Sequence, residues 1–198
     1  MEIVLATGNP GKLREVRAIL APRGIQVRSA RELGFEQEIE ETGTSFADNA
    51  QLKARTVAQA LGIPALADDS GLVVEALGGR PGVYSARYAG PGASDQENNQ
   101  KLLQELAGVP PRQRGAAFVC IMACCKPDGA LLMAKGSLAG RIAQEPAGQE
   151  GFGYDPVFEL PHLGRTVAQL RPQEKNAISH RARALANLVE RLPAFLQG

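Results

Sequence analysis

Residues 2–20, EIVLATGNPGKLREVRAIL, combine a short apolar stretch, a turn and an amphipathic stretch. The apolar stretch, residues 2–6, predicts a buried strand because it is short, aliphatic and followed at once by turn-forming residues. Beyond the turn TGNPG, residues 12–20 predict a helix, since apolar side chains recur on one face at Leu13, Val16 and Leu20. A strand joined to a helix by a tight turn is typical of α/β proteins.

The segments that follow continue this alternation of strand and helix. We expect a strand at residues 25–28 and a second helix that opens at a capping box of Ser45 and Asp48. Apolar side chains then follow the helical period at Phe46, Ala50, Ala54, Val57 and Leu61. Two strands are expected after this helix, at residues 64–68 and 72–77, with a glycine between them.

The second half of the chain contains a hairpin pattern. Ser94 and Glu97 predict the cap of a third helix, and residues 115–126 and 130–138 flank a Pro-Asp-Gly turn that predicts a β-hairpin. A last helix is expected from residue 178 onward. Because strands alternate with helices early and pair as a hairpin late, we expect an α/β fold with a mixed sheet, not a purely parallel one.

The composition limits both the core and the range of partners. The 198-residue chain is 44% hydrophobic but only 5% aromatic, so its core must consist mainly of Ala, Leu and Val. Its 22 Lys and Arg residues balance 21 Asp and Glu residues, for a formal net charge of +1. Such a balance gives no overall field to attract nucleic acid or a membrane surface, so neither is expected as a partner. Any anionic ligand must be held by a local cluster of basic groups.

The sequence also predicts a cytoplasmic location. The N-terminal residues lack the basic start and the apolar stretch of a signal peptide, and no segment approaches the roughly 18 apolar residues that span a bilayer. The three cysteines, Cys120, Cys124 and Cys125, lie in one apolar segment. They are expected to be small core side chains in a reducing compartment, not a disulfide framework or a metal site.

A candidate phosphate-binding turn lies between the first strand and the first helix. It comprises Thr7, Gly8, Asn9, Pro10, Gly11 and Lys12. A helix N-terminus offers unpaired backbone donors, the glycines let a phosphate approach the backbone, and Lys12 adds a full charge. The alternative is an ordinary strand–helix turn with a solvated lysine. The turn is not a Walker A loop, because Ala6 and Leu13 stand where that loop has a glycine and a hydroxyl residue.

Two acidic pairs, Glu40-Glu41 and Asp68-Asp69, are candidates for holding a hard cation. Mg²⁺ binds a few carboxylate oxygens and keeps its remaining sites for water and phosphate oxygens. Asp68-Asp69 directly follows an apolar strand, where adjacent carboxylates are costly unless they are paired or coordinated. Since successive strand side chains point to opposite faces, one member of each pair is expected to face the metal. For Glu40-Glu41, a solvated acidic surface is the stronger alternative.

Two further segments are candidates for recognising a nucleotide base. Small residues surround two aromatic residues at 151–156, GFGYDP, and can form a wall on which a planar base stacks, with Asp155 orienting a neighbour. A glycine-rich turn whose aromatic residues pack inward is about as well supported. Basic and polar side chains also gather at the start of the last helix, at Lys175, Ser179, His180 and Arg181. A solvent-exposed basic turn is the alternative there, although cations at a helix N-terminus oppose its dipole unless an anion joins them.

Together these stretches resemble the Ham1/RdgB family of inosine and xanthosine triphosphate pyrophosphatases. The matching stretches, in the family's order, are ATGNPGK (6–12), EETGTSFADNA (40–50), ADDSGL (67–72), GGRPGVYSARY (78–88), GFGYDP (151–156) and EKNAISHR (174–181). The resemblance implies a single ITPase-like domain over residues 1–198, in which an elongated mixed sheet separates two lobes with the substrate in a cleft. It also implies Mg²⁺-dependent hydrolysis of ITP, dITP and XTP to the monophosphate and pyrophosphate, which cleanses the nucleotide pool, and a homodimer.

The same resemblance assigns roles to individual residues. Residues 7–12 would bind the triphosphate, Asp69 would be the proton acceptor and a metal ligand, Glu40 would help to hold Mg²⁺, and Ser70 would contact the substrate. Further substrate contacts, chiefly around the base, would come from Phe152, Gly153, Tyr154, Asp155, Lys175, His180 and Arg181. Whether Glu40 or Glu41 reaches the metal stays open.

Three other functions compete with this interpretation. A Maf-like nucleotide pyrophosphatase would give the same products from different substrates. A nucleotide sensor without catalysis would keep the turn at residues 7–12 but would be expected to lack the acidic pair, which Asp68 and Asp69 supply. A nucleic-acid-binding module is disfavoured by the near-zero net charge and the lack of a basic stripe.

Overall fold

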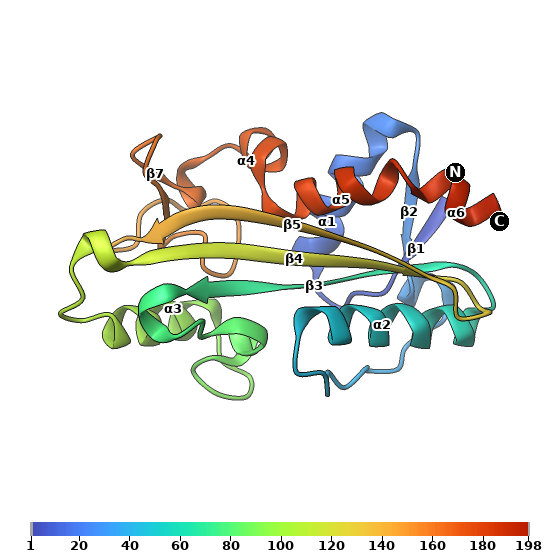
Figure 1. Ribbon diagram of the computed structural model, residues 1–198, viewed down its shortest axis with the longest axis horizontal. Helices are drawn as coiled ribbons and strands as arrows, with labels where there is room; N and C mark the ends of the chain where they lie inside the picture. The colour runs from blue at the N-terminus through green and yellow to red at the C-terminus, as the bar shows by residue number, and fades with distance from the viewer. Residues whose placement is uncertain (1, 198) are drawn as a thin grey trace. The chain divides into compact units, whose positions relative to one another are not determined.

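The computed structural model of the protein describes residues 2–197 and has the α/β architecture with a mixed sheet that the sequence predicts (Figure 1). Within these residues, seven strands form one sheet in the order β2-β1-β3-β4-β5-β6-β7. The strands are β1 (Glu2–Leu5), β2 (Gln26–Ser29), β3 (Ala65–Val74), β4 (Gly115–Cys125), β5 (Leu131–Ile142), β6 (Phe158–Leu160) and β7 (Arg165–Thr166). The α-helices are α1 (Pro10–Leu20), α2 (Phe46–Leu61), α3 (Asp95–Glu105), α4 (Pro172–Ile178), α5 (His180–Val189) and α6 (Leu192–Gln197).

The sheet is mixed because some neighbouring strands are parallel and others antiparallel. Strand β1 pairs in parallel with both β2 and β3, so that Leu5 lies opposite Ser29 on one side and Leu66 on the other. Strand β6 pairs antiparallel with β5 and with β7. Between β4 and β5, the amide of Lys126 donates to the carbonyl of Ala130 and closes the predicted Pro-Asp-Gly turn.

The described chain forms two compact units. Unit 1 contains the chain up to Ser70, the segment Cys120–Gly136 and the chain from His180 onward. Unit 2 contains Gly71–Val119 and Ser137–Ser179. The boundaries fall inside β3, β4 and β5, so each of these strands contributes residues to both units.

In unit 1, helices cover both faces of the parallel strands. Ile3 and Leu5 of β1 belong to an apolar cluster with α1 and α5, whereas Val4 and Ala6 belong to a second cluster with α2. Figure 1 accordingly shows α2 on the opposite side of these strands from α1 and α5. The second cluster consists largely of small buried side chains, among them Ala50, Ala54, Ala58, Ala65 and Ala67. These small residues explain how a core with few aromatic side chains is filled.

The cysteines lie in this core, as predicted. Cys120, Cys124 and Cys125 are buried and form no disulfide. Burial raises the pKa of the Cys120 and Cys124 thiols to about 12, so both stay protonated at neutral pH. They are therefore small apolar side chains of β4 and not reactive groups.

Unit 2 has its own apolar core, which α3 covers through Leu102 and Leu106. Phe118 of β4 stacks on Phe158 of β6 with ring centroids 4.2 Å apart. Tyr154 and Tyr88 also belong to this cluster. Six of the nine aromatic residues of the chain thus lie in unit 2, two of them in the turn at residues 151–156.

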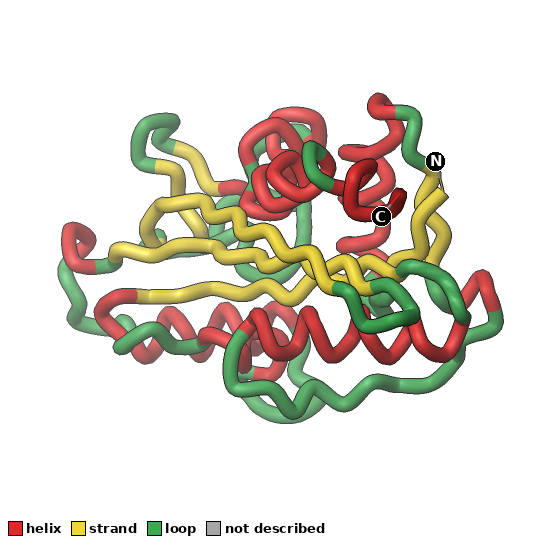
Figure 2. The backbone as a smooth tube through the Cα atoms, turned by 45° about the vertical axis from the view of Figure 1, so that its right-hand side comes forward, coloured by secondary structure: helices red, strands yellow, loops and turns green. Residues whose placement is uncertain are grey.

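The helices begin close to where the sequence predicts. Both predicted capping boxes are present, at Ser45 with Asp48 and at Ser94 with Glu97. Helix α1 begins at Pro10, two residues before the predicted start, because the side chain of Asn9 caps it. A segment without regular structure, residues 35–43, carries the acidic pair and leads into α2 (Figure 2).

Two predicted boundaries are wrong. The strands expected at residues 64–68 and 72–77 form the single strand β3, because the glycine between them, Gly71, keeps a strand backbone without a positive φ. The last helix, expected from residue 178, begins at His180 because Ser179 takes an extended backbone (φ −62°, ψ 154°), and it is divided into α5 and α6 after Val189. Helix α4, which precedes it, was not predicted. Across residues 2–197, no helix is long and apolar enough to cross a membrane.

Candidate active site

The predicted phosphate-binding turn forms the N-terminal cap of α1 in unit 1. Oδ1 of Asn9 accepts hydrogen bonds from the amides of Gly11 (2.8 Å) and Lys12 (3.1 Å), and Oγ1 of Thr7 accepts from the amide of Asn9 (3.2 Å). Two of the helix donors that the sequence predicts to be unpaired are therefore capped by Asn9. The capping fixes the backbone of the turn and the direction in which Lys12 leaves it.

Lys12 is not a solvated lysine. Its Nζ lies 3.1 Å from Oδ2 of Asp68, and its side chain is only 15% exposed. Strand β3 and helix α1 therefore bring together two of the charged residues that the sequence singled out. The ammonium group of Lys12 lies at the partly exposed edge of its ion pair with Asp68, where it can also contact an anion.

Asp68 and Asp69 point to opposite faces of β3, as the alternation of strand side chains requires. Asp68 faces α1 and α5, where it contacts Lys12 and Arg181. Asp69 faces α2, where it contacts Lys53. Ser70 points to the same face as Asp68, and its hydroxyl donates to Oδ2 of Asp68 at 3.1 Å.

Two side chains of α2 hold the Asp69 carboxylate. Nδ2 of Asn49 donates to Oδ2 at 3.2 Å, and Nζ of Lys53 lies 3.4 Å from Oδ1. Both side chains are buried. The sequence analysis missed them, although their spacing gave a signal. They lie four residues apart on the face that also carries Ala50, Ala54 and Val57, so they interrupt an apolar stripe with polar groups.

Of the two glutamates in the loop before α2, Glu41 is the one that contacts this cluster. Its Oε1 lies 2.6 Å from Nζ of Lys53, whereas Glu40 is exposed. The loop is fastened to α2 because the amide of Gly43 donates to Oδ1 of Asn49 at 2.8 Å. A side chain at position 43 would collide with Asn49, since its Cβ would come within 2.5 Å of Oδ1.

The two aspartates differ in their proton affinity. Burial alone would raise the pKa of Asp68, but the charges of Lys12, Arg181 and Lys53 outweigh burial and hold it well below its ordinary value. Burial raises the pKa of Asp69, and Lys53 and Lys12 offset this effect only in part. Asp68 is thus a fixed negative charge that pairs with cations, whereas Asp69 is the better proton acceptor of the two.

Arg181 is enclosed in an ion-pair network. Its side chain is 1% exposed, and its guanidinium contacts Glu15, Oδ2 of Asp68 (3.2 Å) and the hydroxyl of Ser70 (3.0 Å). His180, at the start of α5, is also buried. The structure therefore places Arg181 and Ser70 next to Asp68, where they orient this carboxylate. Glu15 had no feature in the sequence beyond its place on the predicted first helix.

In unit 2, the turn at residues 151–156 brings together three predicted residues. Oδ2 of Asp155 accepts from the amide of Phe152 (2.9 Å) and from Nζ of Lys175 (2.6 Å). The same Nζ lies 4.4 Å from the centre of the Phe152 ring. Gly151 makes this possible, because its positive φ of 81° and lack of a Cβ leave room for the Asp155 carboxylate. An aromatic ring, a cation and a carboxylate thus share one small region.

Tyr154 and Phe152, the two aromatic residues of this turn, have different roles. Its ring is buried in the unit 2 core, and its hydroxyl donates to the carbonyl of Ser85 at 2.9 Å. Phe152, by contrast, is partly exposed. Of the two aromatic residues, Phe152 is therefore the one that can stack on a ligand, while Tyr154 anchors the turn.

The carboxylates of unit 1 fit a hard cation. Asp69 and Glu41, which both contact Lys53, offer oxygen ligands of the kind that Mg²⁺ prefers. Oδ1 of Asp68 is buried and has no hydrogen-bond partner in the described part of the chain. Between residues 2 and 197, no group of three or more His, Cys, Asp or Glu side chains converges as a ready-made metal cage. Such a sparse set suits Mg²⁺, which is commonly held by one or two carboxylates together with water and phosphate oxygens.

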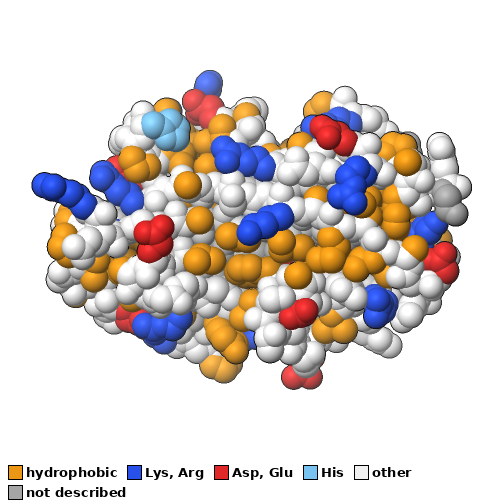
Figure 3. Space-filling model, viewed as in Figure 1, with side chains coloured by type: hydrophobic (Ala, Val, Ile, Leu, Met, Phe, Trp, Pro, Cys, Tyr) orange, Lys and Arg blue, Asp and Glu red, His pale blue; other side chains and the backbone are white. Residues whose placement is uncertain are grey.

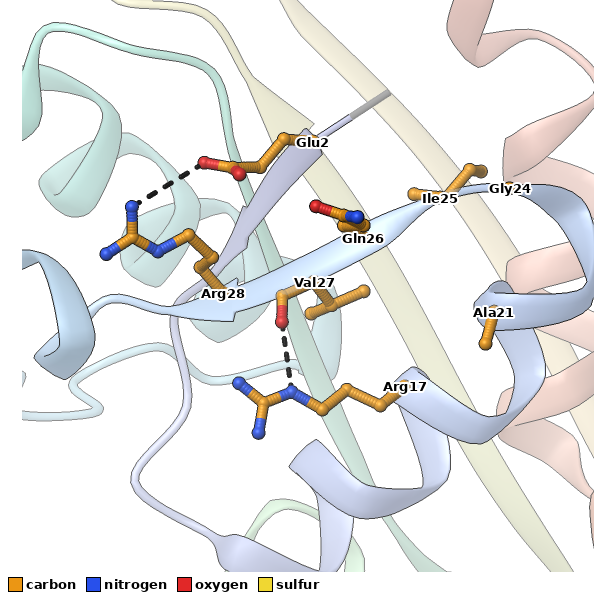
Figure 4. Close-up of a pocket in the computed structure, with 8 residues that line it drawn as sticks. All are labelled: Glu2, Arg17, Ala21, Gly24, Ile25, Gln26, Val27 and Arg28. Atoms are coloured by element: carbon orange, nitrogen blue, oxygen red, sulfur yellow. Dashed lines mark hydrogen bonds and ion pairs between the residues drawn. The ribbon is translucent and has the colours of Figure 1, made fainter.

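A separate hollow in unit 1 lies over α1 and β2 (Figure 4). Its volume of about 510 Å³ is in the range of small-molecule sites. Its arginines are already engaged, however: Nε of Arg17 donates to the carbonyl of Val27 at 2.9 Å, and Arg28 lies 3.8 Å from Glu2. It contains none of the predicted site residues. Elsewhere, Lys and Arg side chains are scattered among apolar and uncharged groups on the face that Figure 3 shows.

Known proteins resemble this chain along nearly its whole length. The model of the Ham1 family matches residues 3–191. A dITP/XTP pyrophosphatase of Yersinia pestis is 54% identical over 193 residues, which cover 96% of this chain and 98% of that protein. The dITP/XTP pyrophosphatase of Bacillus subtilis (strain 168) is 50% identical over 193 residues, 98% of each chain.

Solved structures agree with the sequence comparisons. The structure of a HAM1 protein from Coxiella burnetii matches with a TM-score of 0.88 and 46% identity, over 98% of this chain and 99% of that one. The Ham1 protein of Staphylococcus aureus matches with a TM-score of 0.83 and 43% identity, over 100% and 99% of the two chains.

Proposed function

Because this chain belongs to the Ham1 family, we propose that it hydrolyses the noncanonical purine nucleotides ITP, dITP and XTP to the nucleoside monophosphate and pyrophosphate. The observation that carries the proposal is the Asp69 carboxylate, which Asn49 and Lys53 hold in a largely buried position. This fixed carboxylate suits a group that accepts a proton from an attacking water molecule. The similarity to dITP/XTP pyrophosphatases over nearly the full chain supports the same reaction.

We propose Mg²⁺ as the metal that this hydrolysis requires. Asp69 would hold it, and the contact of Glu41 with Lys53 favours Glu41 over Glu40 as the second carboxylate. When bound, Mg²⁺ neutralises charge on the polyphosphate and fixes the positions of its oxygens. Lys53 shares its charge between Glu41 and Asp69, so it sets the distance between the two carboxylates.

The remaining residues of unit 1 would bind and orient the triphosphate. Lys12 supplies a cation, and the turn at residues 7–12, whose backbone Asn9 fixes by capping α1, would hold this cation toward the phosphates. Arg181 and Ser70 act through Asp68, whose carboxylate they orient and which in turn positions Lys12. Asp68 is thus a positioning residue, while Asp69 is the candidate catalytic residue.

The turn in unit 2 would recognise the base. Phe152 offers a ring for stacking, and Lys175 offers a donor to the oxygen that hypoxanthine and xanthine carry at position 6. Adenine presents a donor at that position, so Lys175 would disfavour it. Guanine shares the oxygen and must be rejected at its 2-amino group. Asp155 holds Lys175 in place, and Gly153 and Tyr154 complete the turn.

A substrate panel tests this function and separates it from its rivals. The purified protein is incubated with Mg²⁺ and ITP, dITP, XTP, GTP, ATP or dTTP, and the products are resolved by anion-exchange chromatography. We expect monophosphate and pyrophosphate from the first three nucleotides in preference to the others. Preference for a pyrimidine or a standard purine would favour a Maf-like enzyme, and binding without turnover would favour a sensor.

Three other expectations remain proposals. The resemblance supports a homodimer and a single ITPase-like domain in which the two compact units are the lobes. The composition supports a cytoplasmic protein without a nucleic-acid or membrane partner. Light scattering of the purified protein tests the homodimer. A mass of about twice 21.0 kDa is expected, and a mass of 21.0 kDa would contradict the dimer.

A further inference from the structure

Helix α3 holds the base-recognition turn of unit 2 through one residue, Gly153. Oδ2 of Asp95 accepts a hydrogen bond from the amide of Gly153 at 2.6 Å. Nδ2 of Asn99 donates to the carbonyl of Gly153 at 2.9 Å. Asp95 and Asn99 lie four residues apart, on one side of the helix, so both backbone polar groups of Gly153 are fastened to α3.

This turn depends on bonds from outside it. Gly151 and Gly153 both have positive φ, of 81° and 63°. Glycine adopts positive and negative φ about equally well, so neither residue fixes its own backbone conformation. Phe152 lies between these two glycines. The amide and the carbonyl of Phe152 are both held by Asp155, whereas the amide and the carbonyl of Gly153 are held by α3. Without Asp95 and Asn99, both polar backbone groups of Gly153 would be released, and the Phe152 ring would be held less firmly beside this flexible residue.

The same part of α3 holds a second segment. Oδ1 of Asn98 accepts from the amide of Ala89 (2.8 Å), and its Nδ2 donates to the carbonyl of Ala86 (3.2 Å). Tyr154 links this segment to the turn through the carbonyl of Ser85. The polar side chains of α3 thus bind two loops, the segment at residues 86–89 and the turn at residues 151–156. Leu102 of α3 and Leu106, which follows the helix, pack in the core.

The Asn99 side chain makes a hydrogen bond through only one end of its amide group in the described part of the chain. The side chain is buried, and its Oδ1 has no hydrogen-bond partner among residues 2–197. Its Nδ2, by contrast, donates to the carbonyl of Gly153. Because an unpaired buried polar group is unfavourable, the bond to Gly153 is the interaction that accounts for an amide side chain at this position.

We propose that Asp95 and Asn99 are positioning residues that set the base selectivity of the enzyme by fixing Gly153 and, through it, Phe152 and Asp155. The inference rests on the proposed function, since it assumes that the turn contacts the base. Discrimination between purines that differ by one polar group needs donors and acceptors fixed to within a fraction of an ångström. A mobile turn would still bind purines but would distinguish them less.

Four variants of α3 separate positioning from folding. Asp95→Ala removes the acceptor for the Gly153 amide. Asp95→Asn keeps a carbonyl oxygen at this position and should therefore keep both the hydrogen bond and the selectivity. Asn99→Leu removes the donor and the unsatisfied oxygen together and keeps the branched shape of the side chain. Gln96→Ala changes an exposed residue of the same helix and is the control. Melting temperatures and kcat and KM for dITP and dGTP are measured for each protein.

We expect Asp95→Ala and Asn99→Leu to lower the ratio of kcat/KM for dITP to that for dGTP by about tenfold, mainly through a higher KM for dITP. Both ratios are measured well below the melting temperature of each variant, so that a change in the ratio reports selectivity and not unfolding. Asp95→Asn and Gln96→Ala should keep the ratio of the parent.

Two different results would overturn the inference, and they distinguish failure of the positioning role from failure of the proposed function. A parent that releases pyrophosphate from dITP, with unchanged ratios in both Asp95→Ala and Asn99→Leu, contradicts the positioning role and leaves the proposed function intact. A parent that releases none contradicts the proposed function and the inference with it.

Discussion

Lys12 and Asp68 form an ion pair, but the two residues have different roles. The contact of Lys12 with Asp68 leaves the ammonium group at the surface of the site, where it can also meet a phosphate. We expect Lys12→Ala to raise the KM for dITP about tenfold or more, because a charge-assisted contact is lost. Arg14→Ala makes the same change of charge at an exposed position of α1 and should leave KM unchanged. Equal KM values for the two variants would show that Lys12 does not touch the triphosphate.

Asp68 also links stability to pH. Its pKa in the folded protein is held below its ordinary value of 3.8, since the nearby cations outweigh burial. A lowered pKa means that the carboxylate stabilises the fold above the unfolded pKa of about 3.9, and that this contribution is lost as the pH falls. The free energy of unfolding should therefore fall more steeply between about pH 5 and pH 3 in the parent than in Asp68→Asn. Urea titrations check this, and parallel slopes would contradict it.

Several site residues were recognisable only in part from the sequence. Asp68 and Asp69 follow an apolar stretch, so their pairing could be predicted from the cost of burying a carboxylate. Their partners could not, because Lys53 and Arg181 reach them from helices that are distant in the chain. Spacing along a helix reveals a shared face but not which strand residue that face meets.

Helix α2 lies close to the sheet because small side chains separate them. Ala54 is fully buried against this face of the sheet, whereas Ala60 is exposed on the same helix. Ala54→Leu should lower the free energy of unfolding by about 1–3 kcal/mol, because the added atoms have no space. It should also lower turnover, since Asn49 and Lys53 lie on the displaced face.

The control for this prediction is Ala60→Leu, the same substitution facing solvent. It should change neither stability nor turnover, since Leu and Ala are both good helix formers. Equal unfolding free energies for the two variants would show that the contact between α2 and the sheet is loosely packed.

At the level of elements, the type of each segment was easier to predict than its ends. The capping boxes at Ser45 and Ser94 marked two helix starts correctly, because they are local hydrogen-bond patterns. Gly71 was mistaken for a strand break, although a glycine in extended backbone can remain in a sheet. Helix α4 was not predicted, and Ser179, which separates it from α5, was assigned to the start of the last helix.

For the whole molecule, alternation of strands and helices followed by a hairpin pattern was enough to predict a mixed α/β sheet. The order of the strands was not predictable in this way. Placing β1 between β2 and β3 depends on pairing between residues far apart in the chain, which periodicity does not encode. The division into two compact units inside β3, β4 and β5 likewise has no signature in composition.

The products formed from dITP test the central claim most directly. The parent and Asp69→Asn, with matched melting temperatures, are each incubated with dITP and Mg²⁺, and dIMP, dIDP, pyrophosphate and orthophosphate are quantified over time. We expect dIMP and pyrophosphate in equal amounts from the parent and almost none from Asp69→Asn, because that change removes the proton acceptor. Release of dIDP and orthophosphate by the parent, or near-normal turnover by folded Asp69→Asn, would contradict it.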